Sequence, residues 1–398
     1  MPVNAEFYTT INELTNRSIT GDVTTPINAA SWIDYGKAMS DLDGETLSNG
    51  FLKNLLNKVK LTVDTYRTYK GKFLGVYRDT ADFGVVEMYL KHFYDSRKAP
   101  FIGLKDGAQY PFTVYLPQED VTYFMDTNAR QTPITIQTVE LRGAFASPEK
   151  MDRFITHIFG NIANSLELQR ENARRALIVN GMRDVIMNHA NGFKSDEPAN
   201  VPTLGEPVQY YPLASMYRKY IGETGGYTGN FNEFEKNSDF IRFAVSVISA
   251  AAKNMGEVTA RMNGKGIKTF SDKIHIVTAQ PFKSLVTLTA MNTFHDNYLV
   301  DGVNGETVSW WESPKNPLNI TFDNTTNLFT AIHSEQGGNL PLKIYAVMYD
   351  EYTFGEFVDL NNTTSQYNGE VDATNYYYND VMRYVYNEYA PLAVFALE

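Results

Sequence analysis

The clearest pattern of apolar and polar positions begins at Ser147 and predicts one long amphipathic helix. Apolar residues recur there at spacings of three and four, which places them on one stripe of a helix. These residues are Met151, Phe154, Ile155, Ile158, Ile162 and Leu166. Ser147 is a favoured N-cap residue, Pro148 suits the first helical position and Glu149 places a negative charge in the first turn.

The far end of this helix is less sharply marked. After Leu168 the apolar stripe thins, so this half is predicted to face solvent or a polar partner. Glu171 and Arg175 stand four residues apart in the order that favours an ion pair. We expect the helix to end or bend at Gly181 and to end no later than Gly192, because glycine disfavours the helical conformation. A helix of about 30 to 40 residues is about 45 to 60 Å long, so we expect it to run along an elongated molecule.

A β-type pattern precedes the helix. The segments 71–90 and 109–116 alternate apolar and polar residues or are rich in β-branched and aromatic residues. The connection between them, 93–111, contains prolines, glycines and charges. These segments predict two strands joined by an extended tip. We expect this hairpin to protrude, because the two segments contain few residues that could cover both of its faces.

Polar and mixed segments lie on either side of these elements. Residues 1–55 are rich in Thr, Asn and Ser and predict an arm with little core of its own, and 190–237 are loop-like. A region with helix and strand patterns follows, with helices at 239–253 and 281–291 and strands at 273–278 and 342–350. This order predicts a small sheet with helices packed against it.

The chain ends in a stretch with six tyrosines between Thr374 and Phe395. Four of them, Tyr376, Tyr378, Tyr384 and Tyr386, fall at even positions and fit one face of a strand. Tyr377 and Met382 break strict alternation, which predicts that both faces are covered. We expect the long helix on one face and a solvent edge or a neighbouring copy on the other. A plain core strand that needs no neighbour is the open alternative.

Composition narrows the class of protein. The 398 residues are 43% hydrophobic and 20% charged and include no cysteine, so disulfides and thiolate chemistry are excluded. No segment has the length of a membrane span or the order of a signal peptide, which predicts a soluble protein that is not exported. The net charge is -11, and from Asp296 onward fifteen acidic residues face three basic ones. This balance disfavours sequence-specific DNA binding, which needs clustered cations.

Tests for catalytic chemistry yield no predicted catalytic, metal or cofactor residue. The glycine-rich segment 222–229 lacks a following Gly-Lys-Ser/Thr and is interpreted as a loop. The six histidines are scattered, and His157 and His275 are interpreted as structural. The adjacent Trp310 and Trp311 fit either a sugar-stacking platform or, more commonly, packing.

Three stretches carry a resemblance to a known family. They are "FAS" at 145–147 leading into the long helix, "NIANSLE" at 161–167 and "NYYYNDVMRYVYNEYAPLAVF" at 375–395. Together with the order of the parts, they resemble the major capsid proteins of small short-tailed, picovirus-like podovirus bacteriophages. The resemblance is good over about residues 118–180 and 340–397 and only architectural elsewhere.

The resemblance implies an α+β Hong Kong 97-like capsid fold with a spine helix from Ser147. It divides the chain into an N-terminal arm, an extended β-hairpin loop, a peripheral domain, an axial α/β domain and a C-terminal strand that returns to the peripheral domain. The corresponding ranges are 1–55, 56–117, 118–234, 235–365 and 366–398.

The function implied is that of a structural, non-enzymatic major capsid protein. It self-assembles through pentamers and hexamers into an icosahedral head that encloses double-stranded DNA. Scaffolding and portal proteins are the expected partners, with no membrane and no cofactor, and assembly in the host bacterial cytoplasm precedes residence in the virion. An encapsulin-like compartment and, from another class, a carbohydrate-active protein are the alternatives. Arg97, Lys98 and Lys105 at the hairpin tip are the candidate intersubunit contacts.

Overall fold

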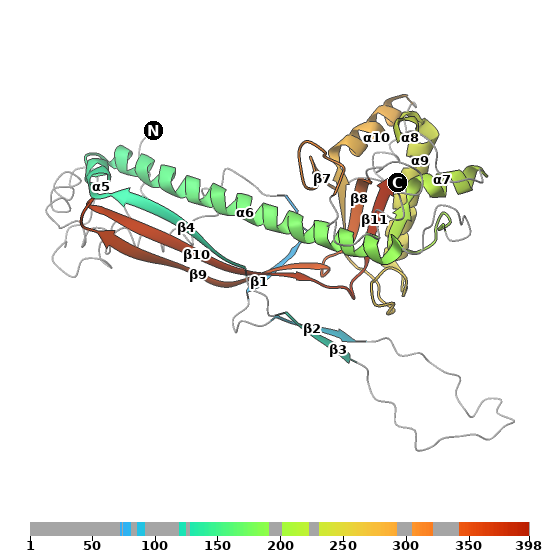
Figure 1. Ribbon diagram of the computed structural model, residues 1–398, viewed down its shortest axis with the longest axis horizontal. Helices are drawn as coiled ribbons and strands as arrows, with labels where there is room; N and C mark the ends of the chain where they lie inside the picture. The colour runs from blue at the N-terminus through green and yellow to red at the C-terminus, as the bar shows by residue number, and fades with distance from the viewer. Residues whose placement is uncertain are drawn as a thin grey trace, which may run out of the picture.

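The computed structural model describes residues 72–73, 75–80, 86–91, 119–124, 128–190, 201–222, 231–292, 305–320 and 342–397. The molecule is elongated, with a compact body at one end and a long blade that extends from it (Figure 1). We use "blade" for β4, β9, β10 and the part of α6 that covers them. We use "body" for the five-stranded sheet and the helices around it.

The elements, in chain order, have the following bounds. They are β1 (Tyr77–Thr80), β2 (Val86–Lys91), β3 (Glu119–Phe124), β4 (Asn128–Gln137), α5 (Thr138–Ala144), α6 (Pro148–Ala190), β5 (Tyr210–Pro212), α7 (Leu213–Ile221), α8 (Phe231–Lys236), α9 (Ser238–Gly256), β6 (Ile274–Ala279), α10 (Gln280–Asn292), β7 (Glu306–Val308), β8 (Lys343–Asp350), β9 (Phe354–Asn368), β10 (Ala373–Tyr386) and β11 (Leu392–Leu397).

Helix α6 begins where the sequence predicts. Its first residue is Pro148, and the Ser147 hydroxyl accepts a hydrogen bond from the Lys150 amide at 3.2 Å. The helix has 43 residues and passes through Gly181 to Ala190. The prediction of a solvated or polar second half is only partly right. A polar partner faces the turns around Arg174, but the last turns lie in the main core with Ile178, Met182, Val185 and Ile186 buried.

Gly181 lies inside α6 because the helix and β9 touch there. A Cβ at this position would lie 2.8 Å from Cε1 of Phe354, a fully buried ring that stacks on Tyr386 with centroids 5.5 Å apart. The missing side chain therefore lets α6 approach the sheet closely.

Gly181→Ala is expected to lower the free energy of unfolding by about 1 to 3 kcal/mol, because the clash outweighs the better helix propensity of alanine. Denaturant unfolding of the two proteins measures the difference. Gly143→Ala in α5 is the control, because a Cβ there meets nothing within 4 Å. The control is expected to be neutral or slightly stabilising, and an equal loss at both positions would contradict the argument.

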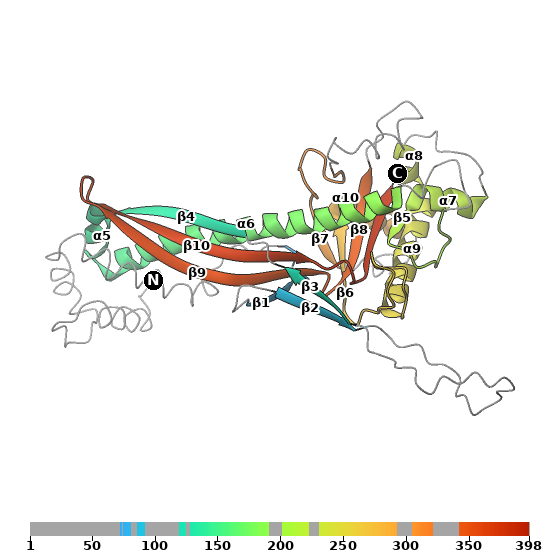
Figure 2. The ribbon, with the colours of Figure 1, turned by 60° about the horizontal axis from the view of Figure 1, so that its bottom comes forward.

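The blade sheet has the order β1-β9-β10-β4. β9 and β10 form a long antiparallel hairpin, and their register shifts where Val381 pairs with Leu360 and Met382 pairs with Val358. Asp359 is therefore an extra residue on β9, a β-bulge, and bulges bend a strand and increase its twist. Both strands curve along their length in Figure 2.

The two faces of the blade sheet differ in chemistry. Even-numbered residues of β10 face α6, among them Tyr376, which is 1% exposed. The opposite face carries uncharged polar side chains that bond across strands, such as Gln131 to Asn379 at 2.8 Å and Thr135 to Asn375 at 2.7 Å. The prediction of a helix on one face of the tyrosine strand is confirmed. The other face needs no helix there because it is polar.

Among the described strands, β4 is the edge strand of this sheet beside β10. Thr138 donates its amide to the Asp372 carbonyl at 3.0 Å, so the even residues of β4 make the bonds to β10 and the odd residues direct their backbone groups outward. Pro133 is odd and has no amide hydrogen to offer. A proline in the middle of an edge strand hinders pairing with a further strand.

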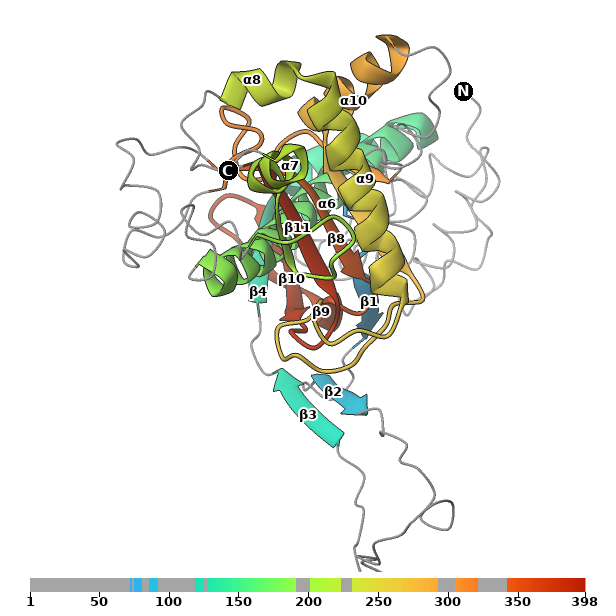
Figure 3. The same cartoon turned by 90° about the vertical axis from the view of Figure 1, so that its right-hand side faces the viewer.

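The body is built on a second sheet with the order β5-β11-β8-β6-β7. β8 and β11 are almost wholly buried, and α7 and α9 cover one face of the sheet (Figure 3). β6, α10 and β8 confirm the predicted order of strand, helix and strand, and β6 pairs with β8 in antiparallel and with the short β7 in parallel. Trp311 is buried in this core, and its Nε1 donates to the Ile344 carbonyl at 2.9 Å.

A two-stranded hairpin of β2 and β3 leaves the molecule beside β1 (Figure 1). It is anchored by a small apolar cluster of Val86, Phe357 and Val385, and Arg383 donates to the Phe124 carbonyl at 3.5 Å. β2 overlaps the end of the predicted strand segment 71–90, and its partner β3, which begins at Glu119, was not predicted. The predicted strand at 109–116 lies outside the described residues.

Candidate functional site

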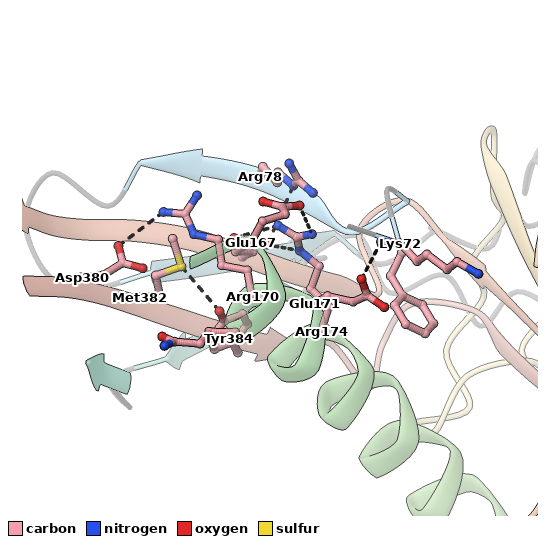
Figure 4. A network of polar contacts seen from close by, with 12 residues as sticks. Lys72, Arg78, Glu167, Arg170, Glu171, Arg174, Asp380, Met382 and Tyr384 are labelled. Atoms are coloured by element: carbon pink, nitrogen blue, oxygen red, sulfur yellow. Dashed lines mark hydrogen bonds and ion pairs between the residues drawn. The ribbon is translucent and has the colours of Figure 1, made fainter. Parts of the chain in front are cut away.

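A layer of charged side chains lies between α6 and the blade sheet, close to the point where α6 leaves the body (Figure 4). We call it the polar layer. It consists of four arginines and four carboxylates: Arg78, Arg170, Arg174 and Arg175, with Glu167, Glu171, Glu356 and Asp380. Formal charges therefore balance within the layer, which is a condition for keeping so many ions away from water.

Arg174 is the centre of the polar layer and is 0% exposed. Its Nε donates to Oε2 of Glu356 at 2.5 Å and its Nη2 donates to Oε1 of Glu356 at 3.3 Å. Its Nη1 donates to Oε1 of Glu167 at 3.3 Å. The guanidinium thus forms a fork on β9 while it also bonds within α6. Such two-pronged contacts fix direction as well as distance.

Further ion pairs tie the helix to both long strands. Arg170 lies 3.4 Å from Asp380 on β10, and Arg78 of β1 lies 3.8 Å from Glu356. The bulged Asp359 accepts from Nη2 of Arg383 at 3.0 Å, and this pair lies on the other face of the sheet, where Arg383 also donates to the Phe124 carbonyl of the hairpin. The bend in the sheet and the ionic contacts to α6 therefore occur at the same level of the blade.

Glu171 and Arg175 form the pair that the sequence predicts, 2.7 Å apart, but the pair is buried rather than on the surface. Glu171 also accepts from the backbone amide of Lys72 at 3.3 Å. The Arg175 guanidinium lies 4.9 Å from the centroid of the Trp310 ring. This end of the layer therefore joins α6 to the chain that enters β1 and to the loop after β7.

Burial and neighbouring charge shift the pKa values in opposite directions. Burial raises the pKa of the Asp380 carboxyl above its ordinary value, and the nearby Arg170 only partly offsets this. Burial opposes the charge of Arg174, but Glu356 and Glu167 outweigh it and hold the Arg174 pKa above the ordinary value. Burial raises the pKa of Tyr384 to about 12. The arginine at the centre is therefore charged at every pH at which the protein folds.

Two hollows lie near the polar layer. On the α6 side of the blade sheet, a groove of about 700 Å³ between β4 and α6 is lined by Ile134, Phe154 and Ile158 among others. A cavity of about 480 Å³ at the base of the hairpin is lined by Tyr352 and Phe357 among others, and Phe357 is on the sheet face that packs against the hairpin. The two hollows therefore lie on opposite faces of the sheet.

The sequence contains a signal for the polar layer that the prediction of the helix did not use. The charged residues of α6 stand at 167, 170, 171, 174 and 175, which is the spacing of an apolar stripe. Charges at stripe positions indicate a buried ionic contact when the stripe resumes beyond them, as it does at Ile178. The partners on β9 and β10 are nearly 200 residues away, and no local pattern points to them.

The residues singled out from the sequence are not gathered at this site. Arg97, Lys98 and Lys105 lie outside the described residues, as does most of the glycine-rich segment 222–229. His157 is exposed on α6, and the His275 ring lies 5.8 Å from that of Tyr349. The buried Trp311 is a packing residue, so the two tryptophans do not form a sugar-stacking platform.

Within the described part of the chain, no group of three His, Asp or Glu residues is placed to hold a metal ion. None of the described helices combines the length and the apolar character that a membrane crossing needs.

Residues 11–396, nearly the whole chain, match a single protein-family model, that of the Phi29-like phage major capsid protein. The chain belongs to this family. Its role is that of a structural major capsid protein, and neither the encapsulin-like compartment nor the carbohydrate-active protein is favoured. As a major capsid protein it assembles in many copies into a shell and is a component of the virion.

Solved phage capsids are similar to this capsid protein over most of its length. The capsid structure of Staphylococcus phage Andhra is 11% identical over 82% of this chain and 84% of that one, with a TM-score of 0.46. The capsid structure of cyanophage P-SCSP1u is 9% identical over 83% and 92%, with a TM-score of 0.43. The mature capsid of bacteriophage PhiM1 is 10% identical over 83% and 88%, with a TM-score of 0.38. No curated protein matches the chain.

Proposed function

We propose that this capsid protein forms the icosahedral head of a small short-tailed bacteriophage, with a subunit of the Hong Kong 97 type. The family match over residues 11–396 carries this proposal. The elongated blade under one 43-residue helix supports it, because such a subunit presents long edges to neighbours. Pentamers and hexamers of the chain close the shell, which encloses double-stranded DNA without reading its sequence.

In this proposal the chain divides as the resemblance implies. Residues 1–55 are an arm, 56–117 the extended hairpin loop, 118–234 the peripheral domain with α6, 235–365 the axial domain and 366–398 the returning strand. Scaffolding and portal proteins guide assembly in the host cytoplasm. The acidic C-terminal part suits a wall around DNA, because carboxylates repel phosphate.

The hairpin supplies contacts between subunits through Arg97, Lys98 and Lys105. The chemistry that supports this is the cluster of three cations within nine residues, between two strands that leave the body with only a small apolar anchor. Carboxylates of an adjacent copy are the partners that such cations favour.

Electron microscopy and size-exclusion chromatography of the purified chain test the proposal. The wild-type protein is expected as closed particles or as pentameric and hexameric capsomers. The variant with Arg97, Lys98 and Lys105 all changed to Glu is expected to remain in smaller oligomers. A control with the exposed Lys150, Lys236 and Lys253 changed to Glu has the same net charge. A wild-type protein that stays monomeric contradicts the proposal, and normal shells from the hairpin variant contradict the role of the three cations.

A further inference from the structure

We infer that the polar layer sets the angle between the blade and the body, and thereby the curvature of the shell that this protein builds. The inference rests on the proposed function, because curvature has meaning only for a subunit that closes into a shell. It assigns a positioning role to Arg174, Glu356 and Glu167, which are buried inside the subunit.

Helix α6 is shared by both parts of the molecule. Its last turns are packed in the body core, with Ile178 and Met182 0% exposed. Its first turns cover the blade sheet (Figure 1). Helix α6 contacts Phe354 closely at Gly181, but a single contact point would let the helix pivot relative to the body. A second fixed contact is needed to set the direction of the helix axis.

The polar layer provides that second point. Arg174 lies seven residues before Gly181, which is about 10 Å along the helix. Apolar contacts tolerate sliding because they have no preferred direction, whereas the Arg174 fork on Glu356 has one geometry. Pro148 lies about 40 Å beyond Arg174, so a pivot of about 5° displaces the end of the blade by about 3 to 4 Å.

The sheet bends at the same level. Glu356 of β9 accepts from Nη2 of Arg174 at 3.3 Å, and Asp380 of β10 lies 3.4 Å from Arg170 of α6. The helix is thus bonded to both long strands close to the bulge at Asp359.

The energetics favour a geometric role over a stabilising one. Replacing a buried ion group by apolar side chains of similar size is often neutral or stabilising, so such a group adds little to stability by itself. Buried polar groups have in some proteins been found to select one register among several. A layer of eight balanced charges next to the bend fits that role.

The test replaces the central triad without leaving a buried charge unpaired. The variant Glu167→Met/Arg174→Met/Glu356→Leu removes all three members, and Arg78 keeps water as a partner because its side chain is 40% exposed. Melting temperature and circular dichroism report on the fold of the subunit, and cryo-electron microscopy of assembled particles reports their diameters. We expect a melting temperature at or above that of the wild type, together with a mixture of diameters in place of one.

Two controls separate geometry from stability. Lys273→Met/Glu351→Leu removes an exposed ion pair of the body, 2.9 Å apart, and is expected to leave one diameter. Ile178→Val weakens the core without touching the polar layer, and is expected to lower the melting temperature while the diameter stays uniform. If Ile178→Val broadens the diameters as much as the triad variant does, instability is the cause and the inference is overturned.

The inference is also overturned if the triad variant folds and forms shells of the wild-type diameter alone. If the triad variant does not fold, Arg174→Lys decides, because it keeps the charge and loses the fork. Mixed diameters from Arg174→Lys support the inference, and uniform wild-type diameters overturn it. A wild-type protein that stays monomeric contradicts the proposed function and the inference together, whereas uniform shells from every variant contradict the inference alone.

Discussion

Replacing Arg174 alone by methionine is expected to lower the free energy of unfolding by about 3 to 5 kcal/mol. The reason is that Glu356 and Glu167, both 3% exposed, then lose the cation that compensates them. Two carboxylates without a central arginine remain in the interior, and their desolvation is no longer offset. Chemical denaturation of the unassembled subunit at neutral pH measures the loss.

Arg242→Met is the matched control for this prediction. Arg242 also lies on a helix and pairs with an acidic residue, Asp239 at 3.7 Å, but its side chain is 42% exposed. The expected change is within about 0.5 kcal/mol, because water replaces the lost partner. If the two arginines give equal changes, the Arg174 cluster is solvated in solution and its description as buried is wrong.

Trp311→Ala is expected to lower the free energy of unfolding by about 3 to 5 kcal/mol. The indole is fully buried beside β8, and its removal leaves a large cavity and an unused carbonyl at Ile344. Near-ultraviolet circular dichroism and denaturant unfolding of the subunit check the result. A small change would mean that the loop carrying Trp311 is not part of the core.

The adjacent tryptophan supplies the control. Trp310 is half-buried and stacks on the Arg175 guanidinium, 4.9 Å from the ring centroid. Trp310→Ala is expected to cost about 0.5 to 1 kcal/mol, the usual range for such a contact at a partly exposed position. The loss of unfolding free energy on replacement by alanine is therefore predicted to be several-fold larger at Trp311 than at Trp310. The two residues are of the same type, so the difference comes from their surroundings.

The local signals in the chain predicted much of the fold. Ser147 and Pro148 located the start of α6, and the periodicity of 239–253 located α9, because capping and amphipathic spacing act within a few residues. Gly181 was interpreted as an end or a bend, but α6 passes through it. The glycine serves a contact with Phe354, which is far away in the chain, so no local pattern distinguishes it from a helix stop.

The candidate site was harder to predict. The Glu171 and Arg175 pair followed from their spacing, yet its burial did not, because burial depends on β9 and β10 lying across the helix. Tyr376 and its even-numbered neighbours were correctly placed on one face. The polar character of the opposite face follows from residues of three strands together, and the bulge at Asp359 appears only in the pairing of β9 with β10.

By itself, the sequence determined the three longest described helices, α6, α9 and α10, the strands β6, β8 and β10, and the family to which this capsid protein belongs. These features rest on short-range spacing or on the order of segments, and both are visible in one dimension. Only the tertiary structure decided that the charges of α6 are an interior layer and that they meet a bend in the sheet. The physical reason is that a charged side chain is a surface group or part of a buried ion pair according to its distances from water and from its counter-ion. Here both distances are set by residues about 200 positions apart in the chain.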